Sequence, residues 1–171
     1  QKSSRRRSWL APTMLFIYAI SFSFAYVSLD TATGALILFA TVQFSMLGIS
    51  LLQGAKLRVI EWVGAAISLS GFVFLMLPGV TQPSLYGFIL MMISGLAWAV
   101  YTLEGKRSEQ PVYNTAVNFW RSVPFALTLL LIAVLYLPIT LSKQGILLAI
   151  ASGVLASALG YTLWYSALRY L

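Results

Sequence analysis

The stretch WVGAAISLSGFVFLMLPGVTQPSLYGFILMMISGLAWAVYTL, from Trp62 to Leu103, decides the fold, because its 42 residues contain no charged side chain. A membrane-spanning helix needs about 20 predominantly apolar residues, so this run is long enough for two. Its middle, LPGVTQPS at residues 77–84, holds two prolines and a glycine, which end helices. The stretch therefore predicts two membrane helices joined by a short turn.

The rest of the chain repeats this pattern of long uncharged runs. The sequence of 171 residues is 60% hydrophobic and 9% charged, whereas a soluble domain carries about 25% charged residues. We therefore predict an all-α, polytopic membrane protein. Its six transmembrane helices are predicted at residues 9–29, 33–53, 59–78, 84–103, 113–137 and 145–168.

The basic residues gather on one side of this topology. Only Lys143 lies on the other side, and Arg121 lies inside a helix. Basic loops stay in the cytoplasm, so residues 1–8 are predicted to be cytoplasmic in an integral, multi-pass protein of the plasma (inner) membrane. The net charge of +7 thus reflects insertion and contact with the lipid bilayer, and no nucleic-acid partner is predicted. The nine residues on the cytoplasmic side are Lys2, Arg5, Arg6, Arg7, Lys56, Arg58, Lys106, Arg107 and Arg169.

The opening stretch QKSSRRRSWLAPTMLFIYAISFSFA, residues 1–25, has two interpretations. A basic run before an apolar run is typical of a signal peptide, and equally of a cytoplasmic loop that enters a membrane helix. Five more apolar runs follow, and the first residue is Gln1 rather than methionine. We therefore expect an internal loop of a longer protein.

An internal repeat points the same way. AISFSFAYVSL (Ala19 to Leu29) aligns without gaps on ALGYTLWYSAL (Ala158 to Leu168), and five helices separate the two segments. An odd number of crossings reverses direction, which is the pattern of inverted-repeat transporters. Residues 1–83 would then hold the last three helices of a first repeat, and residues 84–171 the first three of a second. The parent protein would have ten helices (5+5) in roughly 270–300 residues.

Four segments resemble the EamA-like branch of the drug/metabolite transporter superfamily. That resemblance implies ten helices in two inverted five-helix repeats, which move small metabolites, often outward. The chain departs from the family pattern at Gln43, where proline is common, and at Gly54-Ala55, where a Gly-Glu pair is common. The segments are FAYVSLDTATGALILFATVQFSMLG (24–48), EWVGAAISLSGFVFLMLPG (61–79), GLAWAVYTLEGKRS (95–108) and ASGVLASALGYTLWYSAL (151–168).

Residues for catalysis are scarce. The sequence has no histidine and no cysteine, so the usual ligands of transition metals are missing. Its four acids, Asp30, Glu61, Glu104 and Glu109, lie in loops or at helix ends and form no pair for acid–base chemistry. No metal, no cofactor and no enzymatic activity are predicted.

Two polar residues stand out inside the apolar runs. Arg121 either reaches back to the cytoplasmic headgroups or faces a cavity with Asn118 and holds an anionic group of a cargo. Gln43 either links helices by hydrogen bonds or lines the same cavity, since an amide needs partners within hydrocarbon. Spacing of three and four residues places Thr33, Ala40, Gln43 and Leu47 on one face, which is predicted to be the inward one.

Aromatic and small residues complete the candidate site. Tyr18 and Tyr161 are the deeper aromatic candidates for the lining, whereas Trp98 and Tyr101 serve either as lining or as interfacial anchors. Small residues four apart, Ala149, Gly153 and Ser157, predict close helix packing; Gly64 and Gly71 are expected to do likewise. The predicted substrate-binding residues are Tyr18, Gln43, Trp98, Tyr101, Asn118, Arg121 and Tyr161.

The predicted function is alternating-access transport, in the direction of export, of a small organic metabolite. Two other classes stay open. One is a membrane scaffold or assembly protein, and the other is an intramembrane enzyme whose catalytic residues lie in further helices.

Overall fold

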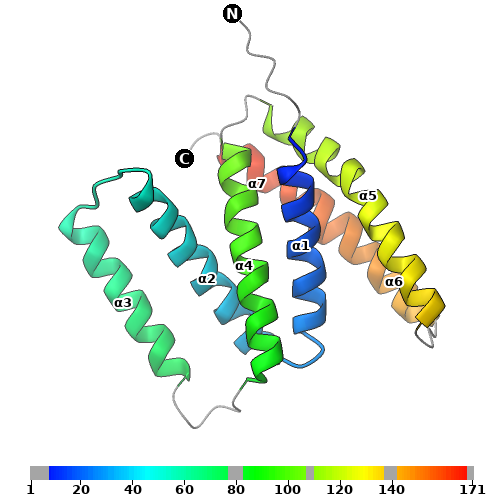
Figure 1. The fold of residues 1–171 in the computed structure, drawn as a ribbon, viewed down its shortest axis with the longest axis horizontal. Coiled ribbons are helices and arrows are strands. Elements are labelled where there is room, and N and C mark those ends of the chain that lie inside the picture. Colours follow the sequence, from blue (N-terminus) through cyan, green and yellow to red (C-terminus); the bar gives the residue numbers. More distant parts are fainter. Residues whose placement is uncertain (1–7, 77–82, 107–109, 137–141, 169–171) are drawn as a thin grey trace, which may run out of the picture. The chain divides into compact units, whose positions relative to one another are not determined.

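The computed structural model describes residues 8–76, 83–106, 110–136 and 142–168, and all of its regular structure is helical (Figure 1). This confirms the predicted all-α class. The segments α6, η1 and α7 follow one another without a break, and η1 is a π-helical stretch. The elements are α1 (Leu10–Ala25), α2 (Thr31–Leu52), α3 (Val59–Met76), α4 (Leu85–Lys106), α5 (Pro111–Tyr136), α6 (Lys143–Ala151), η1 (Ser152–Leu159) and α7 (Gly160–Leu168).

Every predicted range corresponds to one helical region, the last of them to the continuous α6–η1–α7 segment, and the largest difference lies at the end of α1. The prediction ran to residue 29, but the helix ends at Ala25 and a turn follows, in which Ser28 N–H donates to the Ala25 carbonyl. Asp30 then caps α2, because its carboxylate accepts hydrogen bonds from the Thr33 N–H at 3.0 Å and the Thr33 hydroxyl at 2.7 Å. Apolar composition did not reveal this turn.

Among the residues that the structure describes, four helical segments are long and apolar enough to cross a membrane, by length and composition. They are Thr31–Leu52, Leu85–Lys106, Val112–Tyr136 and Lys143–Trp164, while α1 and α3 are shorter apolar helices. Large apolar side chains such as Ile67, Leu131 and Leu147 are exposed on them. Such surfaces are typical of helices that face lipid rather than water.

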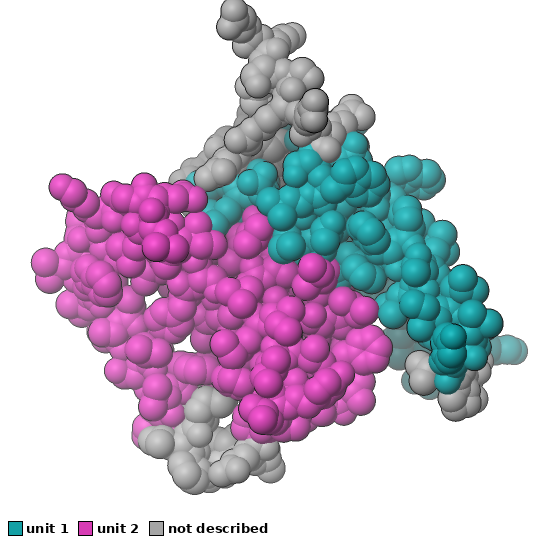
Figure 2. Space-filling model, in the orientation of Figure 1, with its two compact units in different colours: residues 1–16, 102–171 teal, residues 17–101 magenta. Residues whose placement is uncertain are grey.

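The chain divides into two compact units (Figure 2). Unit 1 comprises residues 1–16 and 102–171, and unit 2 comprises residues 17–101. Each unit is described by itself below.

Unit 2 has the densest packing. Its core cluster comprises Ala25, Leu29, Ile37, Leu38 and Met91, from α1, the turn after it, α2 and α4. The Ser94 hydroxyl of α4 donates to the Tyr18 carbonyl of α1 at 3.1 Å.

Glycine permits the close approach of α4 to α2. A Cβ on Gly95 would lie 2.7 Å from the Thr41 Cβ and 3.1 Å from the Leu38 carbonyl oxygen, so a larger residue does not fit there without a shift. The backbones of α2 and α4 can therefore approach closely at this level.

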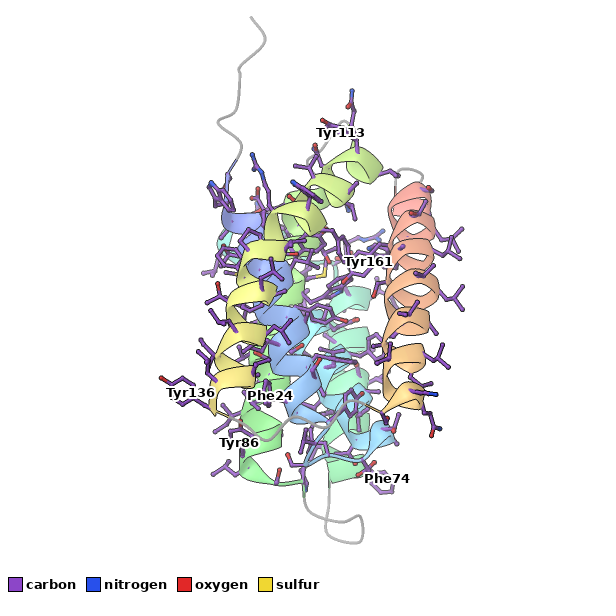
Figure 3. All side chains as sticks on the ribbon, turned by 90° about the vertical axis from the view of Figure 1, so that its right-hand side faces the viewer. Phe24, Phe74, Tyr86, Tyr113, Tyr136 and Tyr161 are labelled. Atoms are coloured by element: carbon purple, nitrogen blue, oxygen red, sulfur yellow. The ribbon has the colours of Figure 1, made fainter. Side chains whose placement is uncertain are left out.

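Unit 1 is built around α5 and the α6–η1–α7 segment. Helix α5 continues through Pro124, and it packs against α7. Phe119 of α5 meets Tyr161 of α7 edge to face, with ring centroids 5.1 Å apart. Tyr113 and Tyr136, near the two ends of α5, are exposed and point away from the helix (Figure 3).

Candidate functional site

Three predicted site residues meet in unit 2. The ring centroids of Tyr18 and Trp98 are 4.8 Å apart, and those of Trp98 and Tyr101 are 5.7 Å apart. Phe22 and Tyr26 extend the row along α1, with centroid distances of 5.6 Å and 4.7 Å. Each such tilted or edge-on pair stabilises the packing by about 0.5–1.5 kcal/mol. The result is a row of five aromatic rings on α1, α4 and the turn after α1.

The members of this row differ in burial. Tyr101 is 1% exposed, so it is a core residue of unit 2, whereas Tyr18 and Trp98 are half-buried. Phe22 and Tyr26 are half-buried as well, so four of the five rings keep some exposed surface. The sequence prediction missed Phe22 and Tyr26, although a spacing of four residues from Tyr18 to Phe22 and again from Phe22 to Tyr26 is typical of one helix face.

Gln43 differs in exposure from the other residues on its predicted helix face. Its side chain is exposed, whereas Thr33 is buried and Ala40 and Leu47 are half-buried. Residue spacing shows which side chains share a face but not where that face points, so the inward direction of this face stays a prediction. The role of Gln43 stays a prediction.

An apolar groove of about 350 Å³ lies in unit 2 between residues of α2, α3 and α4. In Figure 2 the surface of this unit is hollowed rather than closed. Two hydroxyls line the groove, and both donate to backbone carbonyls of their own helix: Thr41 to Ile37 at 2.7 Å, and Ser45 to Thr41. The groove therefore suits hydrocarbon better than the polar groups of a metabolite. Its lining residues are Ile37, Ala40, Thr41, Phe44, Ser45, Leu69, Phe72, Phe88, Met92 and Leu96.

Unit 1 gives Arg121 an aromatic partner. The guanidinium carbon lies 5.2 Å from the centroid of the Trp9 ring, a cation–π contact worth about 0.5–2 kcal/mol. Phe125 packs against Trp9 with ring centroids 6.2 Å apart, and against Phe16 at 5.5 Å. Sequence reasoning missed Trp9, although tryptophan beside a basic run at a helix start is a signal of the membrane interface.

The Trp9 contact also indicates where the charge of Arg121 lies along α1. Arg121 lies ten residues, about 15 Å, past the start of α5, but its guanidinium meets the residue directly before α1. The side chain thus reaches back to the level at which α1 begins. This geometry favours the interfacial interpretation of Arg121 in the described conformation.

Asn118 and Tyr161 also belong to unit 1. Asn118 is half-buried on α5, one turn before Arg121, and Tyr161 is half-buried on α7 against Phe119. The structure thus gathers Tyr18, Trp98 and Tyr101 in one unit, and describes Asn118, Arg121 and Tyr161 in the other.

The described acids have local partners rather than a shared centre. The Glu61 carboxylate accepts from the Arg58 N–H at 2.6 Å and pairs with the Arg58 guanidinium at 3.8 Å. The hydrogen bonds from the Thr33 N–H and hydroxyl hold the pKa of Asp30 below its usual range. Within residues 8–76, 83–106, 110–136 and 142–168, no three histidine, cysteine or acidic residues cluster as metal ligands would.

Comparison with known proteins identifies the family to which the chain belongs. The sequence model of the EamA-like transporter family matches residues 85–171. An uncharacterized protein of Pseudomonas aeruginosa is 45% identical over 163 residues, which cover 95% of this chain and 56% of that protein. An uncharacterized transporter of Archaeoglobus fulgidus is 25% identical over 94% of this chain and 59% of its own length.

A shorter match is the uncharacterized inner membrane transporter YedA of Escherichia coli, 38% identical over 46% of this chain and 26% of that protein. The chain thus spans a little over half the length of the two relatives that match nearly all of it. No solved structure matches it. The family resemblance found in the sequence is confirmed.

Proposed function

Because this chain belongs to the EamA-like transporter family, whose members are transporters and not enzymes, we propose that it is part of an exporter of a small organic metabolite. The main support for this proposal is the family match over residues 85–171, together with the similarity to an inner membrane transporter. We propose the plasma (inner) membrane as its location, with residues 1–8 in the cytoplasm.

The proposed architecture is a ten-helix protein with two inverted repeats, of which this chain supplies six membrane helices. Residues 1–83 belong to the first repeat and residues 84–171 to the second. In support, the 163 matched residues make up 56% of the Pseudomonas relative, which implies a relative of about 290 residues, enough for further helices. The family match begins at residue 85, next to the proposed boundary.

The proposed mechanism is alternating access, in which the two repeats rock about a site near the middle of the membrane. Tyr18 and Trp98 offer half-buried aromatic surfaces, and Asn118 and Tyr161 offer polar groups for hydrogen bonds. Gln43 adds an amide on an otherwise apolar helix. We propose that these five residues line the pathway. Tyr101 is left out because it is buried in the core of its unit.

The test is flux through the full-length protein in proteoliposomes. Radiolabelled amino acids, nucleosides and organic acids are supplied one at a time, and uptake and efflux are measured. We expect saturable flux of at least one class, and a reduction of at least about tenfold in Trp98→Ala. Trp62→Ala is the matched control, because Trp62 is 54% exposed on α3 and lies outside the proposed lining.

Flux equal to that of empty liposomes for every class would overturn the proposal in favour of a scaffold. Conversion of a labelled compound into a new product would instead favour an enzyme.

A further inference from the structure

Four side chains join the start of α1 to α5, on which Arg121 and Phe125 lie ten and fourteen residues past the first residue. Arg121 lies over the Trp9 ring at 5.2 Å, and Phe125 packs against both Trp9 and Phe16, at 6.2 Å and 5.5 Å. All four residues belong to unit 1, so their arrangement is described within one compact body. We call this group the Trp9–Arg121 cluster.

The partner of Arg121 in this cluster is unusual for a cation within a membrane helix. Such cations pair as a rule with carboxylates or backbone carbonyls. Neither α1 nor α5 contains an acidic residue, and the guanidinium lies over an aromatic face instead. A cation–π contact is weaker than a buried ion pair, and it leaves no uncompensated carboxylate when it separates. It can therefore form and break within a working cycle.

The two helices that the cluster joins have different places in the proposed architecture. Helix α1 belongs to the first repeat and α5 to the second, and both begin at the cytoplasmic side. When repeats rock, contacts between them at one end must separate as the pathway opens to that end. A contact between repeats at the cytoplasmic end thus stabilises the state that is closed to the cytoplasm.

We propose that Trp9, Arg121 and Phe125 form a latch that holds the cytoplasmic end of the pathway closed. This inference rests on the proposed function, because it needs two repeats that move against each other. Trp9 acts as a positioning residue, since it fixes the guanidinium by contact and not through the cargo. The latch also assigns Arg121 a role other than binding an anionic cargo.

The experiment uses the full-length protein in inside-out membrane vesicles, with Tyr18→Cys as a reporter on α1, nine residues and about 13 Å past Trp9. The labelling rate of this cysteine by a membrane-impermeant maleimide measures how often the cytoplasmic end opens. Trp9→Leu keeps an apolar side chain but removes the aromatic face. Trp62→Leu is the control, because Trp62 is 54% exposed and Trp9 is 55% exposed, and both lie at helix starts on the cytoplasmic side.

We expect Trp9→Leu to raise the labelling rate about five- to tenfold, the scale of one lost cation–π contact. Trp9→Phe should raise it about twofold, because phenylalanine offers a weaker aromatic face. Arg121→Gln should match Trp9→Leu, and the double variant should add nothing, since both changes remove the same contact. Trp62→Leu should leave the rate unchanged.

Three results would overturn the latch: no change in Trp9→Leu, an equal change in Trp62→Leu, or additive effects in the double variant. If Trp9→Leu does not reach the membrane, Trp9→Phe and Arg121→Lys give the same comparison in milder form, and an unchanged rate in Trp9→Phe counts against the latch. Failure of the proposed transport function would give a different result from failure of the latch. In that case labelling still responds to Trp9, but no labelled metabolite crosses the bilayer.

Discussion

Gly87 and Gly95 of α4 have surroundings opposite to those of Gly153 and Gly160 in the η1–α7 segment. In unit 2 a Cβ on Gly87 would lie 2.5 Å from the Ser28 hydroxyl oxygen, and Gly95 is equally crowded. Around Gly153 and Gly160 nothing described lies within 4 Å. The same residue type at a helix surface therefore marks a completed contact in one region and an open face in the other.

This difference shows what a small residue in an apolar helix does and does not predict. Small residues permit close helix packing, but the packing itself needs a neighbour. The sequence predicted packing at Gly153 and also at Gly64 and Gly71, and all three lie in open space in the described part of the chain. Substitutions at matched positions measure how far the two regions differ.

The largest effect is expected from alanine at the two kinds of glycine. Gly95→Ala should destabilise the protein by about 1–3 kcal/mol, because the new methyl group meets Thr41 and the Leu38 carbonyl. Gly153→Ala should stabilise it by up to about 1 kcal/mol, since alanine favours helix and nothing crowds the site. Unfolding of the full-length protein in detergent measures both. Equal effects at the two positions would remove the distinction between a packed and an open region.

A smaller effect on the free energy of unfolding is expected when a hydroxyl group is removed. Ser94→Ala removes the buried hydrogen bond to the Tyr18 carbonyl and should cost about 0.6–1 kcal/mol. Ser70→Ala is the control, because the exposed Ser70 hydroxyl bonds only to the Ala66 carbonyl of its own helix. The same unfolding measurement applies. A loss at Ser70 as large as that at Ser94 would show that the contact between α1 and α4 adds nothing.

The smallest expected effect is a change in folding stability with pH at a helix cap. Asp30 caps α2 and Ser142 caps α6, where the Ser142 hydroxyl accepts from the Gly145 N–H at 3.0 Å. The Thr33 hydrogen bonds lower the pKa of Asp30 in the folded state, so its contribution is present above the unfolded pKa and is lost as pH falls through the folded pKa. The Ser142 cap should not respond to pH.

Nuclear magnetic resonance of the Asp30 carboxyl carbon measures the pKa of this residue directly. Its titration midpoint should lie below the ordinary aspartate pKa, and Thr33→Val should move the midpoint upward because the hydroxyl donor is lost. A midpoint at or above the ordinary value would contradict the cap.

Much of the fold was predictable because membrane helices need long runs of uncharged, apolar residues, and such runs are visible in the sequence. Long uncharged runs located all six helical regions within a few residues, and Asp30 before an apolar run is a recognisable cap signal. The end of α1 was missed, because Tyr26, Val27 and Leu29 are as apolar as helix residues although they form a turn. Composition measures affinity for lipid, not backbone conformation.

The candidate site was less predictable. The pairing of Tyr18 with Trp98 joins residues 80 positions apart, and no periodicity within a helix reveals it. The direction in which Gln43 points is hard to predict because α2 is apolar on all sides, so no polar stripe shows which face is buried. The partner of Arg121 was missed because the expected counterparts were lipid headgroups or an anionic group of a cargo, whereas the structure places the guanidinium over the Trp9 ring.

Transport, the pathway and the latch all require one topology, in which the chain crosses the membrane six times with its basic loops inside. The most direct test replaces Arg7, Lys56, Lys106 and Lys143 by cysteine, one at a time, in the full-length protein. A membrane-impermeant maleimide is then applied to intact cells. Only Lys143→Cys should be labelled, and the other three should react only after the membrane is permeabilised. Labelling of any of those three in intact cells, or protection of Lys143→Cys, would contradict the account.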